Sequence, residues 1–356
     1  MIWLRRILPA VLVVYVLRAL LSSLPEPVAW WLSLAGGASV FLALHRRKRL
    51  PTAMAPASPG RLDAGQRGRL QRALGSDYVV KERLGAGAFG TVYAVQDLRL
   101  ERELAIKVLD VIDPDTVTRF RREAVILAHL RHPNLVPVYF VGSGPDLLFT
   151  VMPRIKGPNL RWLLTHHPQL GLEIVSSVVV DLAAGLDEAH QARVIHRDVK
   201  PENVLLDAEH RAALLTDFGI AKILQPVEAR DGASVGTLIG TPEYMSPEQC
   251  SSGAITGATD VYSLACVVYE MLIGSPPFSG ESPWDVFRMH QTSPAPSLRA
   301  RRPDIPLELE GCVLQGLAKR PADRFSSAGD FARAVARSTG VPTTGGAWYP
   351  LIGLTR

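Results

Sequence analysis

The segment Val194–Leu206, VIHRDVKPENVLL, brings an aspartate, a lysine and an asparagine close together between apolar flanks. A strand or helix that only packs into a core does not need Asp198, Lys200 and Asn203 in one stretch. A carboxylate can accept a proton from a hydroxyl group, and an ammonium can hold a phosphoryl group. An amide oxygen can bind a hard cation such as Mg²⁺. The segment therefore predicts a loop whose three side chains meet at one γ-phosphate.

A second acidic residue stands after the next apolar run, in ALLTDFGIAK (residues 213–222). Asp217 follows the short apolar stretch and precedes a Phe-Gly pair. The Asp217 carboxylate and the Asn203 amide oxygen are the kind of hard ligands that Mg²⁺ takes beside phosphates. The two residues predict a magnesium site next to Asp198.

The earlier segment Tyr78–Asp97, YVVKERLGAGAFGTVYAVQD, alternates apolar and polar residues on both sides of a glycine cluster. This pattern predicts a strand, a tight loop and a second strand. Gly85, Gly87 and Gly90 match G-x-G-x-x-G, but a dinucleotide-binding turn would continue into a helix, whereas TVYAV is β-branched and alternating. From the residues alone, two interpretations stay open: a hairpin whose backbone N–H groups approach phosphate oxygens, or an ordinary glycine-rich hairpin.

A single lysine, Lys107, lies in the short apolar strand expected at LAIKVLD (Leu104–Asp110). A buried ammonium is costly unless an acidic group pairs with it. The later segment FRREAVILAHLRHPNLV has apolar residues at helical spacing, and Glu123 lies beside that apolar stripe. We expect Lys107 and Glu123 to form an ion pair that directs the ammonium toward a phosphate.

The chain has 356 residues, 47% of them hydrophobic, which is enough for one large domain or two ordinary ones. Its net charge of +5 is uneven, because residues 1–75 hold 11 basic and 2 acidic residues and the remainder holds 28 and 32. The main part of the chain lacks the basic character of a nucleic-acid-binding domain, so we expect no nucleic-acid partner. Three scattered cysteines (Cys250, Cys266, Cys312) argue against a disulfide framework or a zinc site.

The N-terminal region contains two apolar segments, Ile7–Leu24 and Val28–Leu44. Each would form a helix of about 26 Å, close to the thickness of a hydrocarbon core. Two arginines precede the first segment and HRRKR follows the second, so the excess of basic residues places both ends in the cytoplasm. We predict a two-helix anchor over residues 1–49 in the inner membrane. One span with an interfacial first helix, or a cleaved signal peptide, remains an alternative.

Residues 50–76 are rich in Pro, Ala, Gly, Ser and Arg and have little apolar periodicity. They predict a flexible linker. Residues 338–356, STGVPTTGGAWYPLIGLTR, have a similar composition and predict a flexible tail.

From about Tyr78 to Arg337, roughly three quarters of the chain, the sequence resembles the protein kinase family. The nearest resemblance is to the bacterial Hanks-type serine/threonine kinases. The motifs that carry it follow the family's order: LGAGAFGTV, AIK, Glu123, HRDVKPEN, DFG, GTPEYMSPEQ, DVYSL and RPADRF. Eight matches in order at workable spacing leave little room for chance. SPE at residues 246–248 replaces the usual Ala-Pro-Glu and is a mild departure.

The resemblance implies an α+β fold, the bilobal protein-kinase fold, over residues 77–337, preceded by the two predicted transmembrane helices. The small β-rich N-lobe with one main helix would span residues 77–152, and the hinge residues 153–157. The larger helical C-lobe would span residues 158–337. VYSLACVVYEMLI, too short to span a membrane, would be the buried helix of the large lobe.

The resemblance also implies roles for the residues of the predicted phosphate site. Lys107 would contact the α- and β-phosphates of ATP, and Glu123 would anchor Lys107. Asp198 would be the catalytic base, and Lys200 would hold the transferred phosphoryl group. The ligands of Mg²⁺ would be Asn203 and Asp217.

ATP is the cofactor that the resemblance implies beside Mg²⁺, with FTVMPRIKG (residues 149–157) as the hinge that hydrogen-bonds adenine. Pro153 departs from the family pattern, but the family uses the carbonyl at that position and not the N–H that proline lacks. Ile155 keeps the N–H expected to meet adenine. The implied nucleotide-binding residues are Leu84, Gly85, Gly87, Phe89, Gly90, Val92, Ala105, Lys107, Met152, Pro153, Ile155 and Leu205.

Further residues would support the site. Glu248 should pair with Arg324 and fix the substrate platform, and Asp260 should hold the backbone of the catalytic loop. The residues in supporting roles would be His196, Arg197, Phe218, Thr241, Glu248, Asp260 and Arg324. Arg197 beside Asp198 resembles kinases that are switched on by phosphorylation of the activation loop. The candidate acceptors in that loop are Ser234 and Thr237.

The expected function is therefore that of a membrane-anchored serine/threonine protein kinase, because Lys200 and Thr241 are marks of serine/threonine kinases. Its partners would be proteins that carry Ser or Thr, the lipid bilayer, and a second copy for autophosphorylation in trans. ATP is cytosolic, so the catalytic domain should face the cytoplasm. A pseudokinase that binds ATP as a scaffold would usually lack the lysine, the base or a metal ligand. A small-molecule kinase would normally lack GTPEYMSPEQ.

Overall fold

The computed structural model describes residues 62–87, 90–110, 128–144, 147–218, 241–251, 253–342 and 344–353. Residues 66–356 form one compact unit, and the account that follows concerns that unit. Several predictions lie outside the described residues: both membrane segments, Phe89, Glu123, Ser234 and Thr237. Within the described ranges no helix is both long and apolar enough to cross a bilayer.

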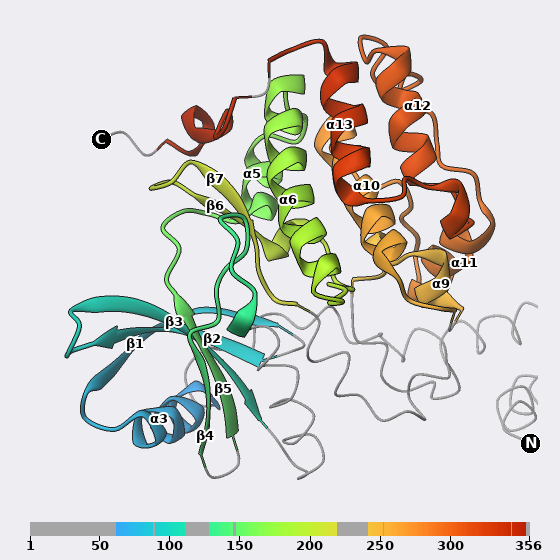
Figure 1. Ribbon diagram of the computed structural model, residues 1–356. Coiled ribbons are helices and arrows are strands. Elements are labelled where there is room, and N and C mark those ends of the chain that lie inside the picture. Colours follow the sequence, from blue (N-terminus) through green and yellow to red (C-terminus); the bar gives the residue numbers. More distant parts are fainter. Residues whose placement is uncertain are drawn as a thin grey trace, which may run out of the picture. The chain divides into compact units, whose positions relative to one another are not determined.

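The N-terminal lobe is built on an antiparallel sheet of five strands, in the order β1-β2-β3-β5-β4 (Figure 1). The strands are β1 (Tyr78–Gly87), β2 (Gly90–Asp97), β3 (Arg102–Asp110), β4 (Phe140–Gly144) and β5 (Leu147–Pro153). The predicted strand, loop and strand are confirmed, because β1 and β2 pair from Tyr78↔Asp97 to Gly87↔Gly90. Gly90 has φ +120°, and a Cβ there would lie 2.1 Å from the Val108 carbonyl oxygen. The hairpin therefore requires glycine at this position.

A helix, α3 (Leu62–Leu74), covers one face of this sheet, so the prediction of a flexible linker over residues 50–76 is wrong for this part. Leu70 is fully buried in a cluster with Tyr93, Ile106 and other apolar residues of the sheet. The Gln71 side chain accepts the Val80 N–H at 2.9 Å and donates to the Tyr78 carbonyl at 2.7 Å. The apolar face of the sheet has to be covered. The few apolar residues of α3 cover it, although most residues of this helix are polar.

Replacing Leu70 with alanine should lower the free energy of unfolding by about 2–5 kcal/mol, because the side chain leaves a cavity under α3. Chemical denaturation of the full chain measures this loss. Leu100→Ala is the control, because Leu100 is 63% exposed and its removal leaves no cavity. Equal stability of the two variants would show that α3 contributes nothing to the folded lobe.

The C-terminal lobe is mainly helical (Figure 1). Its helices are α5 (Leu160–His166), α6 (Leu172–Gln191), α9 (Pro247–Cys250), α10 (Gly257–Ile273), α11 (Pro283–Thr292), α12 (Leu307–Gly316) and α13 (Ala328–Thr339). A two-stranded sheet of β6 (Val204–Asp207) and β7 (Ala212–Leu215) completes it. A β-sheet lobe followed by a helical lobe confirms the predicted bilobal architecture.

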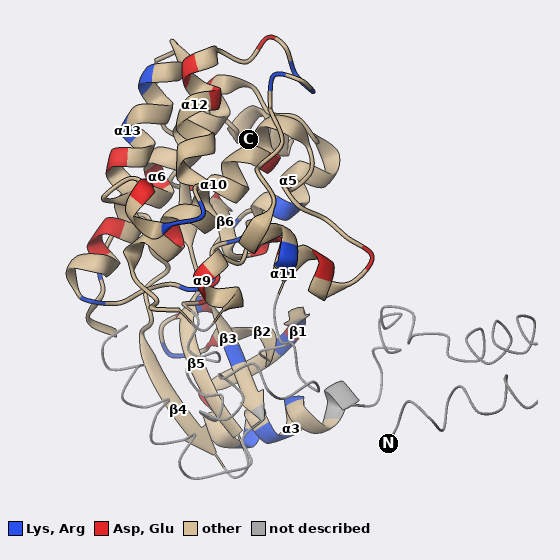
Figure 2. Cartoon of the chain, turned by 90° about the vertical axis from the view of Figure 1, so that its right-hand side faces the viewer, with Lys and Arg blue, Asp and Glu red and all other residues tan. Residues whose placement is uncertain are grey.

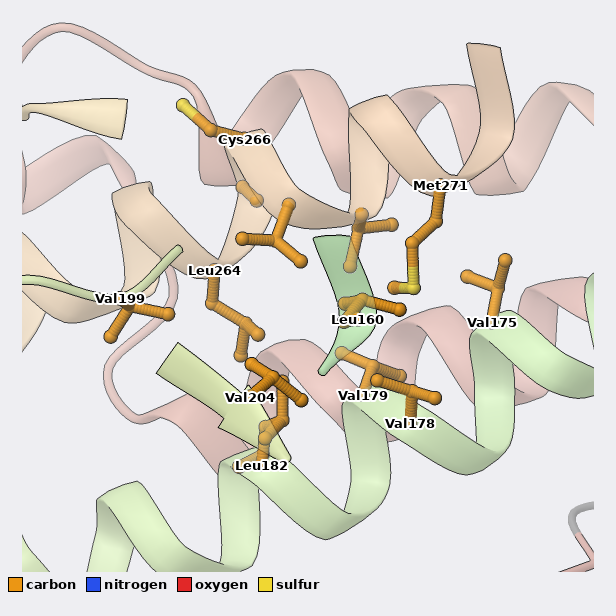
Figure 3. Close-up of a cluster of buried hydrophobic side chains, with 14 of the residues drawn as sticks. Leu160, Val175, Val178, Val179, Leu182, Val199, Val204, Leu264, Cys266 and Met271 are labelled. Atoms are coloured by element: carbon orange, nitrogen blue, oxygen red, sulfur yellow. The ribbon is translucent and has the colours of Figure 1, made fainter. Parts of the chain in front are cut away.

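Helix α10 is the centre of this lobe, since every residue from Thr259 to Ile273 is buried. The expectation of a buried helix in this segment is therefore confirmed. Apolar residues of α6 recur at helical spacing, as at Val175, Val178 and Leu182, and face α10. Figure 3 shows side chains of the two helices meeting in one apolar cluster. The outer helices carry acidic and basic residues mixed along their surfaces (Figure 2).

The prediction of a flexible tail over residues 338–356 is wrong for most of that segment. Helix α13 continues to Thr339 and ends at Gly340, which has φ +66°. Trp348 is fully buried in the core of the C-terminal lobe. The Arg211 guanidinium lies 4.5 Å from the centre of the Tyr349 ring. Glycine and proline suggested a linker, but the buried Trp348 and the partly buried Tyr349 pack against the core and stabilise an ordered segment.

Candidate active site

The loop between α6 and β6 contains residues His196–Asn203. Helix α10, at the centre of the lobe, anchors this loop. Asp260, fully buried near the start of α10, accepts two successive backbone N–H groups. Its Oδ2 lies 2.8 Å from the His196 nitrogen, and its Oδ1 lies 2.8 Å from the Arg197 nitrogen. Two charge-assisted hydrogen bonds therefore anchor the loop to α10.

The imidazole of His196 links the loop to the segment that precedes Asp217. Its Nδ1 accepts the Asp198 N–H at 3.2 Å, so the ring proton lies on Nε2, which donates to the Thr216 carbonyl at 2.9 Å. Burial lowers the pKa of His196, which agrees with a neutral ring. The ring also packs against Phe218 at a tilt, with ring centres 4.6 Å apart.

Asp198, Lys200 and Asn203 form one hydrogen-bonded cluster. The Lys200 Nζ lies 2.9 Å from the Asp198 Oδ2. The Asn203 Nδ2 donates to the same Oδ2 at 2.9 Å and to the Asp198 carbonyl at 2.8 Å. Thr241 is nearby, since its Oγ1 accepts from the Lys200 Nζ at 3.4 Å. The structure thus brings together the three side chains of the quoted segment.

Asp217 contacts Lys107, which comes from β3 of the other lobe. The Lys107 Nζ lies 2.8 Å from the Asp217 Oδ1, and both side chains are largely buried. Asp217 has φ +61°, a left-handed conformation that an aspartate adopts only with local support. The expected partner Glu123 lies outside the described residues. Lys107 therefore meets the predicted metal ligand directly.

The residues expected around adenine form a single apolar cluster. Ala105 and Met152 are buried in it, and Val92, Ile155 and Leu205 pack against it while partly exposed. Leu205 comes from β6 of the C-terminal lobe and the others from the sheet lobe or the hinge. Within the described part of the chain the Ile155 N–H makes no hydrogen bond. This arrangement suits a flat ring that needs apolar faces and one backbone donor.

Three further residues of this cluster were not predicted: Val136, Ala212 and Leu214. The register of β6 and β7 explains Leu214, because it pairs with Leu205. Strand pairing of this kind could have been expected from the short apolar runs on either side of the turn at residues 208–211.

Glu248 and Arg324 form a buried, bidentate ion pair with both oxygen–nitrogen distances at 2.8 Å. The Arg324 side chain is fully buried and also donates to three backbone carbonyls, those of Ala258, Ala318 and Lys319. All five N–H groups of the guanidinium therefore have acceptors. The pair joins the SPE segment to the loop after α12.

Arg161 of α5 lies in a charge network that no motif indicated. Its Nε donates to Glu202 at 2.8 Å and its guanidinium donates to Glu270 at 2.6 Å. It also donates to the Tyr244 hydroxyl, which in turn donates to Glu270. Burial by itself would lower the pKa of Arg161, but the two glutamates raise it above its ordinary value. The network connects α5, α10 and the segments that flank the catalytic cluster.

The two lobes thus carry a cluster of acidic, basic and amide groups beside an apolar cluster, an arrangement typical of a kinase. Residues 78–333 match the family model described as "Protein kinase domain". The chain belongs to the protein kinase family, in its bacterial Hanks-type branch, as the sequence motifs predicted.

Named relatives agree with this assignment. The chain is 39% identical over 269 residues to the serine/threonine-protein kinase PknB of Mycolicibacterium smegmatis, covering 72% of this chain and 42% of that one. It is 36% identical over 261 residues to the serine/threonine-protein kinase PrkC of Bacillus subtilis, covering 71% and 39%. Against the serine/threonine-protein kinase PknH of Mycobacterium bovis it is 36% identical over 260 residues, covering 72% and 43%. The match thus spans about two fifths of each relative's length.

Proposed function

We propose that this chain is a serine/threonine protein kinase that transfers the γ-phosphoryl group of Mg·ATP to hydroxyl groups of protein substrates. The observation that carries the proposal is the cluster of Asp198, Lys200 and Asn203 beside the Lys107–Asp217 pair. The names of the relatives, all serine/threonine-protein kinases, support it.

The residues present fit a magnesium ion. The Asn203 Nδ2 is engaged by Asp198, so the amide oxygen of Asn203 is the atom left to bind a cation. Asp217 adds a carboxylate, and one or two such ligands are what Mg²⁺ takes when phosphates complete its shell. When bound, the ion would neutralise charge on the phosphate oxygens. Asn203 and Asp217 would hold it.

The residues present also fit ATP. The apolar cluster around Ala105 and Met152 would enclose the adenine ring, and the Ile155 N–H would donate to it. The β1–β2 hairpin, with glycine required at Gly90, would bring backbone N–H groups to the phosphates. The Lys107 ammonium would neutralise phosphate charge from its position beside Asp217.

The chemical work of the chain's own groups follows from their contacts. Asp198 would accept the proton of the substrate hydroxyl, because its carboxylate is oriented by Asn203 and Lys200. Lys200 would hold the phosphoryl group in transit with its ammonium. Thr241, within reach of Lys200, would help to place the substrate segment.

Phosphotransfer is tested by incubating the chain with γ-labelled ATP, Mg²⁺ and a mixed library of Ser-, Thr- and Tyr-containing peptides. We expect label on Ser and Thr, identified by phosphoamino-acid analysis. Removal of Mg²⁺ with a chelator should abolish the transfer. ATP binding without transfer to any peptide would contradict the proposal and point to a pseudokinase scaffold.

We also propose that residues 1–49 anchor the kinase domain in the inner membrane with the domain in the cytoplasm. The support is the sequence alone: two apolar segments of nearly 20 residues between basic flanks. A reporter active only outside the membrane should be silent when fused after Arg49 and active when fused within Pro25–Pro27. The reverse pattern would contradict the anchor and the cytoplasmic domain.

We further propose that autophosphorylation in trans, between two copies, activates the chain at Ser234 or Thr237. The support is Arg197 beside Asp198, since a guanidinium can pair with a phosphate through bidentate hydrogen bonds. Mass spectrometry of the wild type and of Asp198→Asn should find the phosphate in the wild type only. Full activity of the Ser234→Ala/Thr237→Ala double variant would contradict the switch.

A further inference from the structure

Gln249 is a residue that the motifs left without a role, and it lies between the SPE segment and the catalytic loop. Helix α9 begins after Ser246 with proline in its first turn, and Ser-Pro-Glu-Gln forms a capping box. In this motif the Ser246 side chain accepts the Gln249 N–H, and the Gln249 side chain accepts the Ser246 N–H at 3.0 Å. The cap therefore fixes the direction of the Gln249 side chain.

The other end of the same amide reaches the catalytic loop. The Gln249 Nε2 donates to the Arg197 carbonyl at 2.9 Å. The Ser246 N–H is a donor and the Arg197 carbonyl is an acceptor, so only one orientation of the amide satisfies both. A glutamate would serve the capping box equally well but would have no N–H for Arg197. Glutamine is thus required for the second contact and not for the first.

The group that Gln249 holds is the peptide unit directly before Asp198. The carbonyl of this unit accepts from Gln249, and its N–H donates to the His196 Nδ1 at 3.2 Å. Arg197 itself has φ +66°, a left-handed conformation that is unfavourable for a residue with a Cβ. Its own N–H is held by Asp260 at 2.8 Å. Hydrogen bonds from three directions therefore hold a strained backbone whose orientation aims the Asp198 side chain.

We propose that Gln249 is a positioning residue that aligns Asp198 with the substrate platform through the Arg197 carbonyl. The proposal rests on the proposed phosphotransfer and adds a residue to it. One amide contacts both the backbone of the platform, at Ser246, and the backbone before Asp198. The Gln249 side chain therefore couples the position of the substrate platform to the position of Asp198. Displacement of Ser246 disturbs the base as well.

The first test compares Gln249→Met with wild type in the full chain. Methionine keeps the length of the side chain and loses both hydrogen bonds. We expect kcat to fall about tenfold, because a lost hydrogen bond at the base misaligns it. KM for ATP should stay within about twofold, since Gln249 joins the substrate platform to the catalytic loop and does not contact the hinge. Gln291→Met is the matched control here, and Gln291→Glu is the control for the pH profile, because the exposed Gln291 of α11 also donates to a backbone carbonyl, that of Cys250 at 2.9 Å.

A pH profile of Gln249→Glu separates positioning from general stability. The introduced carboxylate can still accept the Ser246 N–H but cannot donate to Arg197. When protonated, it regains a donor, and partial burial favours the protonated form. The ratio of its kcat to that of wild type should rise as the pH falls from about 7 toward about 4.5, where a glutamate carboxyl ordinarily takes up its proton. The same ratio for Gln291→Glu should not change.

Hydrogen exchange gives a measurement that does not depend on activity. Amides in peptides covering residues 194–206 should exchange faster in Gln249→Met than in wild type and in Gln291→Met. If the wild type showed no phosphotransfer, the proposed function would be wrong. The hydrogen-exchange result would still test the contact between Gln249 and the Arg197 carbonyl. The inference is overturned if exchange is unchanged and kcat of Gln249→Met stays within twofold of wild type. It is also overturned if KM for ATP rises as much as kcat falls, or if the pH ratio is flat.

Discussion

Replacing Asp198 with asparagine should lower kcat for peptide phosphorylation by about 10²- to 10⁴-fold, the range that a general base contributes. The Oδ2 of Asp198 accepts from Asn203 and Lys200, and the oxygen of an asparagine can take the same place. The remaining NH₂ group cannot accept a proton from a hydroxyl. The geometry of the loop should thus survive while the base is lost.

Affinity for ATP should stay within about threefold of wild type in this variant, because the base acts on the substrate hydroxyl and not on the nucleotide. Steady-state kinetics and a fluorescent ATP analogue measure the two quantities. Asp304→Asn is the control, since Asp304 is exposed and, among the residues that the structure describes, its carboxylate pairs with Arg302. Wild-type activity no higher than that of Asp198→Asn would refute the role of the base.

Replacing Arg324 with methionine should lower the free energy of unfolding by about 3–5 kcal/mol at neutral pH, because it leaves the Glu248 carboxylate buried without its cation. The guanidinium supplies five hydrogen bonds, two to Glu248 and three to backbone carbonyls. Chemical denaturation followed by tryptophan fluorescence measures the loss. Arg333→Met, which removes an exposed ion pair with Asp330, is the control and should leave the midpoint nearly unchanged.

The pH dependence of this effect has a definite sign. Burial alone would raise the pKa of Glu248, but the hydrogen bonds from Arg324 outweigh it and hold the pKa below the ordinary value of 4.5. In wild type the pair therefore stabilises the fold above about pH 4.5, and this contribution is lost as the pH falls through the lowered pKa. In Arg324→Met the unpaired carboxyl should have a raised pKa, so protonation relieves it. The stability gap between wild type and Arg324→Met should narrow as the pH falls, beginning above pH 4.5 at the raised pKa of the variant, and a gap that widens would contradict this account.

Much of the candidate site could be predicted from the sequence, because packing into a core does not require this combination of residue types in one stretch. Asp198, Lys200 and Asn203 are close in the chain, so a single loop had to bring them together. Alternating residues around the glycine cluster predicted the β1–β2 hairpin, since strand periodicity is a local property. The apolar character of residues 261–273 likewise predicted the buried helix α10.

Composition led to wrong predictions of a flexible linker and a flexible tail at the two ends of the domain. Residues 62–74 and 344–353 resemble linkers because of their glycine, proline and polar residues, yet Leu70 and Trp348 are fully buried. Burial of each such side chain contributes about 1.5–3 kcal/mol toward ordering the segment that carries it. The position at which such a side chain is buried becomes predictable only when the apolar face that it covers is known.

The sequence by itself determined the family, the order of a β-sheet lobe and a helical lobe, and the residues of the proposed phosphate site. The tertiary structure decided the contacts among residues far apart in the chain. It brought Asp260 to the amides before Asp198, Arg324 to Glu248, and Gln249 to the Arg197 carbonyl. The physical reason is that a hydrogen bond depends on distance and direction within a few tenths of an ångström, whereas periodicity and propensity report only on neighbours along the chain.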